Sequence, residues 1–183
     1  MLRLLFFGAG SVGIAALSWR SMRDRSAHGF YRFFAFELLL ALIALNAPAW
    51  FRNSLSPRQA LSYSLGAISI GLAVEGFRLL SMVGKPSKSA AEKTNLGFEN
   101  TTELVTTGAY RFIRHPLYAS LLALGWSAYW KDPLRVEGML LVAGATAFLF
   151  ATAKCEEREN LRRFGAGYGD YMKRTRRFVP FLL

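Results

Sequence analysis

The residues from Thr106 to Tyr118 are the part of this chain best equipped for chemistry. The run Thr-Thr-Gly-Ala-Tyr-Arg-Phe-Ile-Arg-His-Pro-Leu-Tyr contains one of only two histidines, together with two arginines and two tyrosines. Proline lacks a backbone N–H and fits the first turn of a helix. The pattern therefore predicts that Arg114 and His115 directly precede a helix that begins at Pro116. An interfacial anchor is the alternative interpretation, because arginine and tyrosine are common at membrane boundaries.

Two adjacent carboxylates, Glu156 and Glu157, are the second candidate for chemistry. They directly follow an apolar segment, at the depth where a carboxylate is costly unless it has a partner. One interpretation is an interhelical ion pair with Arg111 or Arg114. The other is that a carboxylate binds a cationic group of a ligand close to His115.

Three further charges lie inside apolar segments, namely Glu37, Glu75 and Arg78. Glu75 and Arg78 are spaced i, i+3, so we favour mutual neutralisation for them. Glu37 stands alone and is the stronger functional candidate of the three.

Several familiar catalytic patterns are missing from the sequence. It has no Gly-rich phosphate loop after a strand and no Ser–His–Asp arrangement. Cys155 is the only cysteine, and the two histidines, His28 and His115, are far apart, so we expect no disulfide and no metal site. This argues against hydrolase, kinase and metalloenzyme chemistry.

The composition indicates a membrane protein rather than a nucleic-acid binder. Apolar residues make up 52% of the 183 residues, charged residues only 19%, and Lys and Arg outnumber Asp and Glu by 23 to 12. A soluble nucleic-acid binder carries its charge on a polar surface, whereas here the charges lie between apolar runs. We therefore expect membrane lipids as partners and no nucleic acid.

The apolar runs predict an all-α, polytopic membrane protein with about five transmembrane helices in a single domain over residues 1–183. Each run is short for the ~17–25 residues of a span, and flanking aromatic and snorkelling basic residues extend it. A soluble bundle would need polar faces at helical spacing, which residues 38–45 and 138–150 lack. The predicted spans are 4–19, 33–51, 60–84, 116–130 and 134–153.

Basic residues predict the orientation of these spans. Seventeen of the 23 Lys and Arg residues fall in the loop 20–32, the polar connector 84–115 and the tail 154–183. The positive-inside tendency places these three segments in the cytoplasm. The opening motif and the C-terminus then face the same compartment.

The tail carries one apolar stripe at helical spacing, and basic residues lie mostly off that stripe. This is typical of an amphipathic helix lying on an anionic membrane surface. Three glycines at 165, 167 and 169 predict a break, followed by a second short helix that ends near Phe178–Pro180. The stripe consists of Leu161, Phe164, Tyr168 and Tyr171.

The run from Thr107 to Tyr118 closely resembles the signature of the isoprenylcysteine carboxyl methyltransferase and phospholipid methyltransferase superfamily of integral-membrane enzymes. The tail resembles the second half of that signature. The resemblance covers roughly Leu104 to Pro180, and Ser120 departs from it where many members have glycine. The tail residues that carry it are Glu156, Glu157, Leu161, Phe164, Gly165, Tyr168, Tyr171 and Pro180.

The resemblance implies methyl transfer from S-adenosylmethionine to a lipophilic or membrane-partitioning acceptor, without a metal, in a site open to the cytosol. Arg111 or Arg114 would hold the cofactor's carboxylate, and Glu156 its ammonium or sulfonium end. Thr152 stands where carboxyl-methylating members have a substrate-binding arginine, which argues against a prenylcysteine carboxylate acceptor. The residues implied to bind the cofactor are Leu104, Tyr110, His115, Pro116, Leu117, Tyr118, Glu156 and Glu157.

Two other functions compete with this hypothesis. One is a membrane reductase of the sterol-reductase type, which would bind NADPH instead. The other is a small non-enzymatic membrane scaffold or transporter subunit whose charged motifs only anchor helix ends. Binding of S-adenosylhomocysteine or of NADPH would separate the three.

Overall fold

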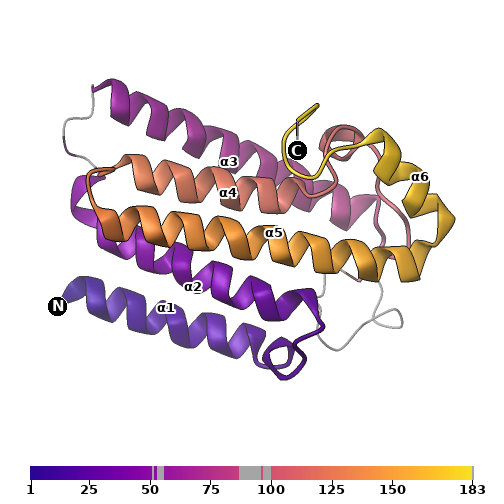
Figure 1. Ribbon diagram of the computed structural model, residues 1–183, viewed down its shortest axis with the longest axis horizontal. Helices are drawn as coiled ribbons and strands as arrows, with labels where there is room; N and C mark the ends of the chain where they lie inside the picture. Colours follow the sequence, from indigo (N-terminus) through magenta and orange to yellow (C-terminus); the bar gives the residue numbers. More distant parts are fainter. Residues whose placement is uncertain (51, 53–55, 87–95, 97–99, 183) are drawn as a thin grey trace.

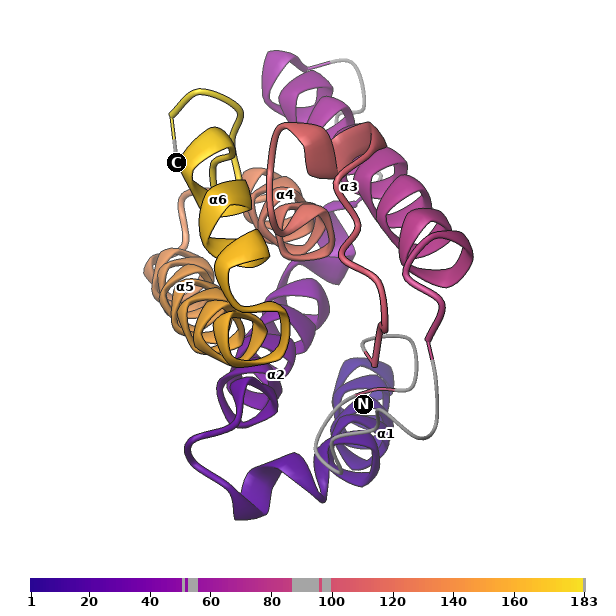
Figure 2. The same cartoon turned by 90° about the vertical axis from the view of Figure 1, so that its right-hand side faces the viewer.

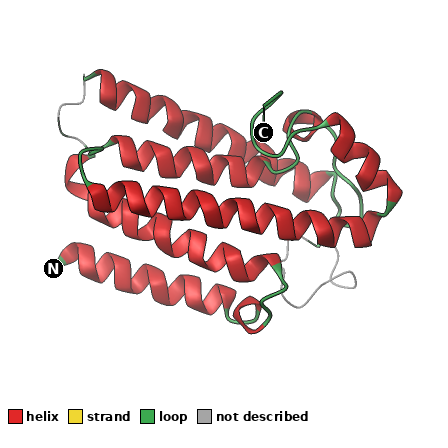
Figure 3. Cartoon of the chain, in the orientation of Figure 1, coloured by secondary structure: helices red, strands yellow, loops and turns green. Residues whose placement is uncertain are grey.

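The structure, a computed structural model, describes residues 1–50, 52, 56–86, 96 and 100–182. This part of the chain is all-α, as predicted, and contains helices and loops but no strand (Figure 3). The α-helices are α1 (Leu2–Ser18), α2 (His28–Asn46), α3 (Pro57–Met82), α4 (Pro116–Trp130), α5 (Val136–Phe164) and α6 (Ala166–Arg174). Short 3-10 helices are η1 (Ser21–Arg23), η2 (Ala47–Ala49) and η4 (Gly108–Arg111).

Helices α1 to α5 run side by side as a bundle, and α6 lies at one end of it (Figures 1 and 2). Helix α2 packs against α1, α4 and α5, while α4 also packs against α3 and α5. Helix α4 is therefore enclosed by its neighbours, and the segment that precedes it is held at the same end of the bundle as α6.

Three helical segments are long and apolar enough to cross a membrane, namely His28–Ala49, Pro57–Met82 and Val136–Phe164. Helix α1 is apolar but has 17 residues, and α4 has 15. The five predicted spans thus correspond to the five helices of the bundle, of which three have the length and composition of a full span. Apolar side chains such as Phe6, Ile70 and Val74 are exposed on α1 and α3, which suits contact with lipid.

Several helix boundaries differ from the predicted spans, and two of them add polar or charged turns. Helix α2 begins at His28 rather than at 33, and its first turns bury the polar residues His28 and Arg32. Helix α5 continues through the charged residues after 153 and ends at Phe164. Lys, Glu, Arg and Leu are all good helix formers, so the helix continues where the apolar composition stops. Phe51, the last residue of the predicted second span, lies outside the described residues.

The tail also differs from its prediction. Helix α5 ends at Phe164, and the predicted glycine break lies at the next residue, Gly165, whose φ of +57° favours glycine. Gly167 and Gly169 lie inside α6. Helix α6 ends at Arg174, before Phe178. Its two tyrosines, Tyr168 and Tyr171, are buried in the protein. The apolar stripe of α6 therefore packs on the bundle rather than facing a membrane.

Helices α3 and α4 are joined by a seam of serines. The Ser62 hydroxyl donates to the Ser127 carbonyl at 2.8 Å, and the Ser127 hydroxyl donates back to the Ser62 carbonyl at 2.7 Å. Further along, the Ser69 hydroxyl donates to the carbonyl of Ser120 at 2.8 Å. Small residues allow close approach of membrane helices, and such hydrogen bonds stabilise their contact. Ser120 thus lies in a helix contact, where the related signature often has glycine.

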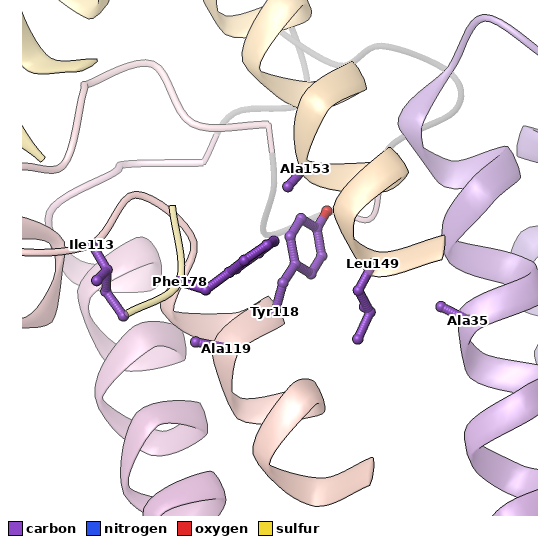
Figure 4. Packing of buried hydrophobic residues seen from close by; sticks show 7 residues of the cluster. All are labelled: Ala35, Ile113, Tyr118, Ala119, Leu149, Ala153 and Phe178. Carbon is purple, nitrogen blue, oxygen red and sulfur yellow. The ribbon is translucent and has the colours of Figure 1, made fainter. Parts of the chain in front are cut away.

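A hydrophobic cluster joins the motif before α4 to the rest of the bundle (Figure 4). Tyr118 of α4 packs with Leu149 of α5, Ala35 of α2 and Phe178 of the tail. Segments that are far apart in the sequence, from α2 to the C-terminal tail, therefore meet around the first turn of α4.

The loop between α1 and α2, the described part of the connector between α3 and α4, and α6 all lie at one end of the bundle (Figure 1). The turns after α2 and α4 lie at the other end, near the N-terminus. Residues 87–95 and 97–99 of the predicted connector lie outside the described residues.

Candidate active site

The second residue of the Thr107–Tyr118 motif is a glycine that no other residue can replace without strain. Gly108 opens η4 with a φ of +57°, and a Cβ at this position would lie 2.5 Å from Glu75 Oε1 and 2.6 Å from Leu79 Cδ1. The close approach holds η4 against α3. Glu75 thus faces this glycine, and no ion pair with Arg78 is found among the described residues.

The C-terminal segment runs alongside the same motif. The backbone N–H groups of Arg114 and His115 donate to the carbonyls of Arg176 and Arg177, at 2.7 and 3.1 Å. The N–H of Arg176 donates back to Phe112 at 3.0 Å, which completes a parallel bridge between Ile113 and Arg176. The two halves of the predicted signature are therefore joined by backbone hydrogen bonds.

Glu157 is clamped between two arginines. Arg114 Nε donates to Glu157 Oε1 at 2.8 Å, and Arg177 Nη2 donates to Oε2 at 2.6 Å. The Glu157 side chain is 5% exposed, and a second guanidinium nitrogen of Arg114 donates to the Thr175 carbonyl at 2.6 Å. This is the interhelical pairing that the sequence left open, and it fixes the tail on α5.

A small cavity of about 70 Å³ opens beside this clamp. Its walls come from the end of α3, the segment before α4, the first turn of α4, the end of α5, and α6. Of the residues predicted to act in catalysis or bind the cofactor, Leu104, Tyr110, Arg114, His115, Leu117, Tyr118 and Glu156 line it.

The remaining predicted residues lie outside the cavity wall. Arg111 is exposed, with its guanidinium 5.8 Å from the ring centre of Phe112. Pro116 is buried at the start of α4, and Glu157 is held by Arg114 and Arg177. The structure thus brings together Arg114, His115 and Glu156 but leaves Arg111 apart from them.

His115 and Glu156 face one another without a hydrogen bond. His115 Nδ1 lies 3.7 Å from Glu156 Oε2, and Nε2 lies 3.5 Å from Glu157 Oε1. Although the imidazole is buried, its Nε2 has no hydrogen-bond partner. The ring stacks on Tyr118, with centroids 5.4 Å apart at 19°. A buried polar atom without a partner is unusual in a folded protein, and this one lies beside the Glu157 carboxylate.

Two tyrosines of α6 cover the cavity from the other side. Tyr171 donates from its hydroxyl to the Tyr110 carbonyl at 2.7 Å. Burial raises the pKa of the Tyr171 phenol, and burial followed by the charge of Glu156 raises the pKa of Tyr168. Both therefore remain neutral phenols near neutral pH.

Sequence reasoning missed several residues of this region, of which two have polar side chains next to the two glutamates. Asn160 lines the cavity one turn after Glu156, and Arg177 forms half of the Glu157 clamp. The i, i+4 spacing from Glu156 could have indicated Asn160. Nothing in the local pattern around Arg177 distinguishes it from the neighbouring arginines, because its partner comes from another part of the chain.

Comparison with known proteins points to methyltransferases. The chain is similar to methanethiol S-methyltransferase 2 of Bradyrhizobium diazoefficiens, with 39% identity over 74 residues that make up 40% of this chain and 27% of that protein. It is 33% identical to methanethiol S-methyltransferase 1 of the same organism over 73 residues, or 39% of this chain and 24% of that protein. The methanethiol S-methyltransferase of Mycobacterium tuberculosis is 33% identical over 73 residues, or 39% of this chain and 28% of that protein.

The chain thus spans about a quarter of the length of these relatives. No family model and no solved structure matches it significantly. The relatives nevertheless confirm the resemblance to methyltransferases that the two motifs predicted.

Proposed function

We propose that this protein is an integral-membrane methyltransferase that binds S-adenosylmethionine in the cavity between α4, α5 and α6. The observation that carries the proposal is the cavity wall itself, in a chain similar to methyltransferases. The wall combines the carboxylate of Glu156, the buried imidazole of His115 and several aromatic rings.

The residues present suit this cofactor. Glu156 has a carboxylate on the cavity wall that is not held in an arginine clamp, unlike its neighbour Glu157, so it can bind the ammonium or sulfonium end. Tyr110, Tyr168 and Tyr171 offer aromatic surface for the adenine. Arg114 also lines the cavity, but its guanidinium is already engaged by Glu157 and Thr175. We therefore assign it to holding the site together rather than to binding the cofactor's carboxylate alone.

The size of the cavity sets a condition on binding. Its volume of about 70 Å³ is below the ~300–1,000 Å³ of typical ligand pockets. Part of the wall has to move when the cofactor enters. Helix α6 is the wall best able to do so, because a single glycine joins it to α5.

The protein's own residues would bind the cofactor, orient it towards the acceptor and remove a proton from the acceptor. When bound, S-adenosylmethionine supplies a methyl group already activated by its positively charged sulfur. Glu156 holds that end of the molecule, and Tyr118 with Phe178 keeps the His115 ring in place. His115 accepts the proton that a neutral acceptor must lose, which is the role of a general base. Alignment of the methyl donor with the acceptor, in a site that excludes water, provides the remaining rate enhancement.

We further propose that the acceptor is a small apolar thiol or another molecule that partitions into the membrane. The curated relatives are named for methanethiol. At the position where a carboxylate acceptor would need an arginine, Thr152 is fully buried and donates to the Phe148 carbonyl at 2.7 Å. A prenylcysteine carboxylate would therefore find no cation there.

Calorimetry and methyl transfer on detergent-purified protein test the proposal. We expect saturable binding of S-adenosylhomocysteine and none of NADPH. Labelled methyl groups should then appear on methanethiol or a longer alkanethiol, but not on a prenylcysteine carboxylate. Binding of NADPH alone would favour a reductase, and binding of neither would contradict the enzyme assignment.

A further inference from the structure

A second polar cleft lies apart from the candidate active site. It has a volume of about 230 Å³ and lies between the segment Arg25–Tyr31 and one face of α5. It shares no lining residue with the cavity described above. Its size suits the headgroup of a lipid better than a drug-sized ligand, since such ligands occupy about 300–1,000 Å³.

The walls of this cleft are strongly basic. Lys154, Arg158 and Arg162 follow one another at i, i+4 and i+8 along α5, and Arg25 faces them from the other wall. In the part of the chain that the structure describes, none of these four forms an ion pair with a carboxylate within 4.0 Å. Like charges at this spacing destabilise a helix, so the row is costly unless an anion joins it.

The one acidic residue of the wall is already engaged. Glu159 accepts hydrogen bonds from His28 Nδ1 at 2.6 Å and from the His28 backbone N–H at 2.9 Å. The Cys155 thiol donates to the Ser26 carbonyl at 2.8 Å. These contacts fasten the Arg25–Tyr31 segment to α5, so the cleft is built from two walls held in fixed positions and keeps its positive charge.

We infer that the cleft lies at the level where the bundle leaves the membrane. Trp19, which follows α1, is 58% exposed, and the Arg23 guanidinium lies 5.3 Å from the centre of its ring. Tryptophan is typical of membrane interfaces. The apolar part of α5 ends at Ala153, next to the cleft residue Lys154. About one helical turn earlier on α5, Phe148 stacks on Phe34 of α2. An acyl chain would find apolar surface there.

We propose that this cleft binds the phosphate headgroup of an anionic phospholipid. Guanidinium groups bind phosphate oxygens through paired, charge-assisted hydrogen bonds, and basic pockets between helices on the cytoplasmic side suit acidic headgroups. The charge and the depth of the cleft support this binding site independently of the proposed methyltransferase activity.

Titration of short-chain lipids into the purified protein in a nonionic detergent tests this inference. The probes are short-chain phosphatidylglycerol, short-chain phosphatidylcholine and inorganic phosphate, followed by calorimetry. We expect saturable binding of phosphatidylglycerol and at least tenfold weaker binding of the other two. Equal affinity for phosphatidylcholine would overturn the role of charge, and equal affinity for inorganic phosphate would overturn the assignment to a lipid.

Matched variants locate the binding. The double variant Arg158→Gln, Arg162→Gln should lose roughly 10- to 30-fold in affinity, since each basic group near a charged surface contributes on the order of 1 kcal/mol. The control Lys173→Gln, Arg174→Gln removes the same charge from α6, outside the cleft. If both double variants lose the same affinity, the cleft is not the site. Arg25→Gln, on the exposed opposite wall, gives the same test should the α5 variant fail to fold.

Discussion

Two neighbouring glutamates have very different surroundings. Glu157 is clamped by Arg114 and Arg177 and is 5% exposed, whereas Glu156 is 25% exposed and lies 3.7 Å from His115 on the cavity wall. The two side chains leave α5 about 100° apart, as successive helical residues do. One therefore points into the contact with the tail and the other into the cavity.

This contrast predicts opposite effects of the same substitution. Glu156→Gln should leave the melting temperature nearly unchanged, as exposed substitutions usually do within about 0.5 kcal/mol, and should weaken binding of S-adenosylhomocysteine by at least tenfold. Glu157→Gln leaves two guanidinium groups facing an amide and should cost about 3–5 kcal/mol of stability. Thermal unfolding and calorimetry on both variants check this. Near-normal affinity in the Glu156 variant would return that residue to a structural role.

The resemblance implied that His115 binds the cofactor, whereas the proposed role as a general base predicts that it acts on the acceptor. Because the residue is buried, with 5% exposure, His115→Gln is a gentler change than truncation to alanine. It should retain binding of S-adenosylhomocysteine but lose about 10²–10⁴ in rate with a thiol acceptor, the usual contribution of a general base.

The pH dependence gives the control for this variant. An alkanethiol loses its own proton as the pH rises, so the rate of the variant should climb with pH and approach that of the parent protein. A merely structural defect would leave the deficit constant at every pH, and an unimpaired rate at neutral pH would remove His115 from the mechanism.

For individual residues, the sequence predicted which of them meet but not what each one does. Gly108, Arg114, His115 and Glu156 are brought to one end of the bundle from two motifs, as the pattern indicated. The sequence indicated Arg111 or Arg114 as the ion-pair partner of a glutamate at this position. The fold shows that Arg114 forms this pair with Glu157. Arg111 is exposed on η4. The second guanidinium group that pairs with Glu157 comes instead from Arg177, which follows Glu157 by 20 residues.

At the scale of the elements, the contact between α3 and α4 positions the site, because α4 carries His115 at its N-cap and Tyr118 in its first turn. The reciprocal hydrogen bonds between Ser62 and Ser127 should contribute measurably to this contact. The double variant Ser62→Ala, Ser127→Ala is expected to lose about 1–2 kcal/mol, since each interhelical hydrogen bond in a membrane protein contributes roughly 0.6 kcal/mol and at most about 1.7.

Ser64→Ala is the matched control. Its hydroxyl donates to the Ala60 carbonyl within the same helix and is exposed, so its removal should change stability little. Unfolding in a denaturing detergent compares the variants. Equal losses in both would show that the seam between α3 and α4 contributes no more than a local hydrogen bond.

Helix α6 is where the sequence and the structure differ most. Three glycines in five residues predicted a break, which lies at Gly165, where φ is positive. Gly167 and Gly169 continue the helix, because burial of Tyr168 and Tyr171 compensates their low helix propensity. An apolar stripe shows that a helix needs a partner surface. It cannot show whether that surface is a membrane or the protein itself.

Movement of α6 should accompany cofactor binding. The cavity it covers is smaller than the cofactor requires, so residues 166–174 have to shift when the cofactor enters and to pack on it once bound. Hydrogen exchange should therefore slow in α6 on addition of S-adenosylhomocysteine, while the exchange of α2 stays the same. Unchanged exchange in α6 at saturating ligand would contradict this arrangement.

At the scale of the whole molecule, the fold class and the bundle of five helices were predictable from apolar runs, while the number of complete spans was not. Hydropathy measures composition over a window, but whether a 15-residue helix needs to span the bilayer depends on what surrounds it. Helix α4 is about 22 Å long at 1.5 Å per residue, shorter than the ~30 Å hydrocarbon core. Helix α4 packs against α2, α3 and α5. These helices can therefore surround the polar backbone groups at the ends of α4, which lipid could not satisfy with hydrogen bonds.

The arrangement predicts a topology that reporters can test. The segment before α2, the approach to α4, the end of α5 and α6 lie at one end of the bundle. The loop 20–32, the connector 84–115 and the tail 154–183 hold 17 of the 23 basic residues, so this end should face the cytoplasm. A fluorescent protein fused to the C-terminus should therefore fluoresce inside the cell. Alkaline phosphatase inserted at Asp132, in the turn after α4, should be active outside it.

A fusion at the N-terminus decides the role of α1. If α1 crosses the membrane as one of five spans, the two termini lie on opposite sides, and an N-terminal phosphatase fusion should be active. If α1 with its 17 residues stays on one side, the N-terminal reporter would behave like the C-terminal one. A C-terminal reporter that works only outside the cell would reverse the orientation, and it would place the candidate active site away from the cytosol, where S-adenosylmethionine is expected to enter.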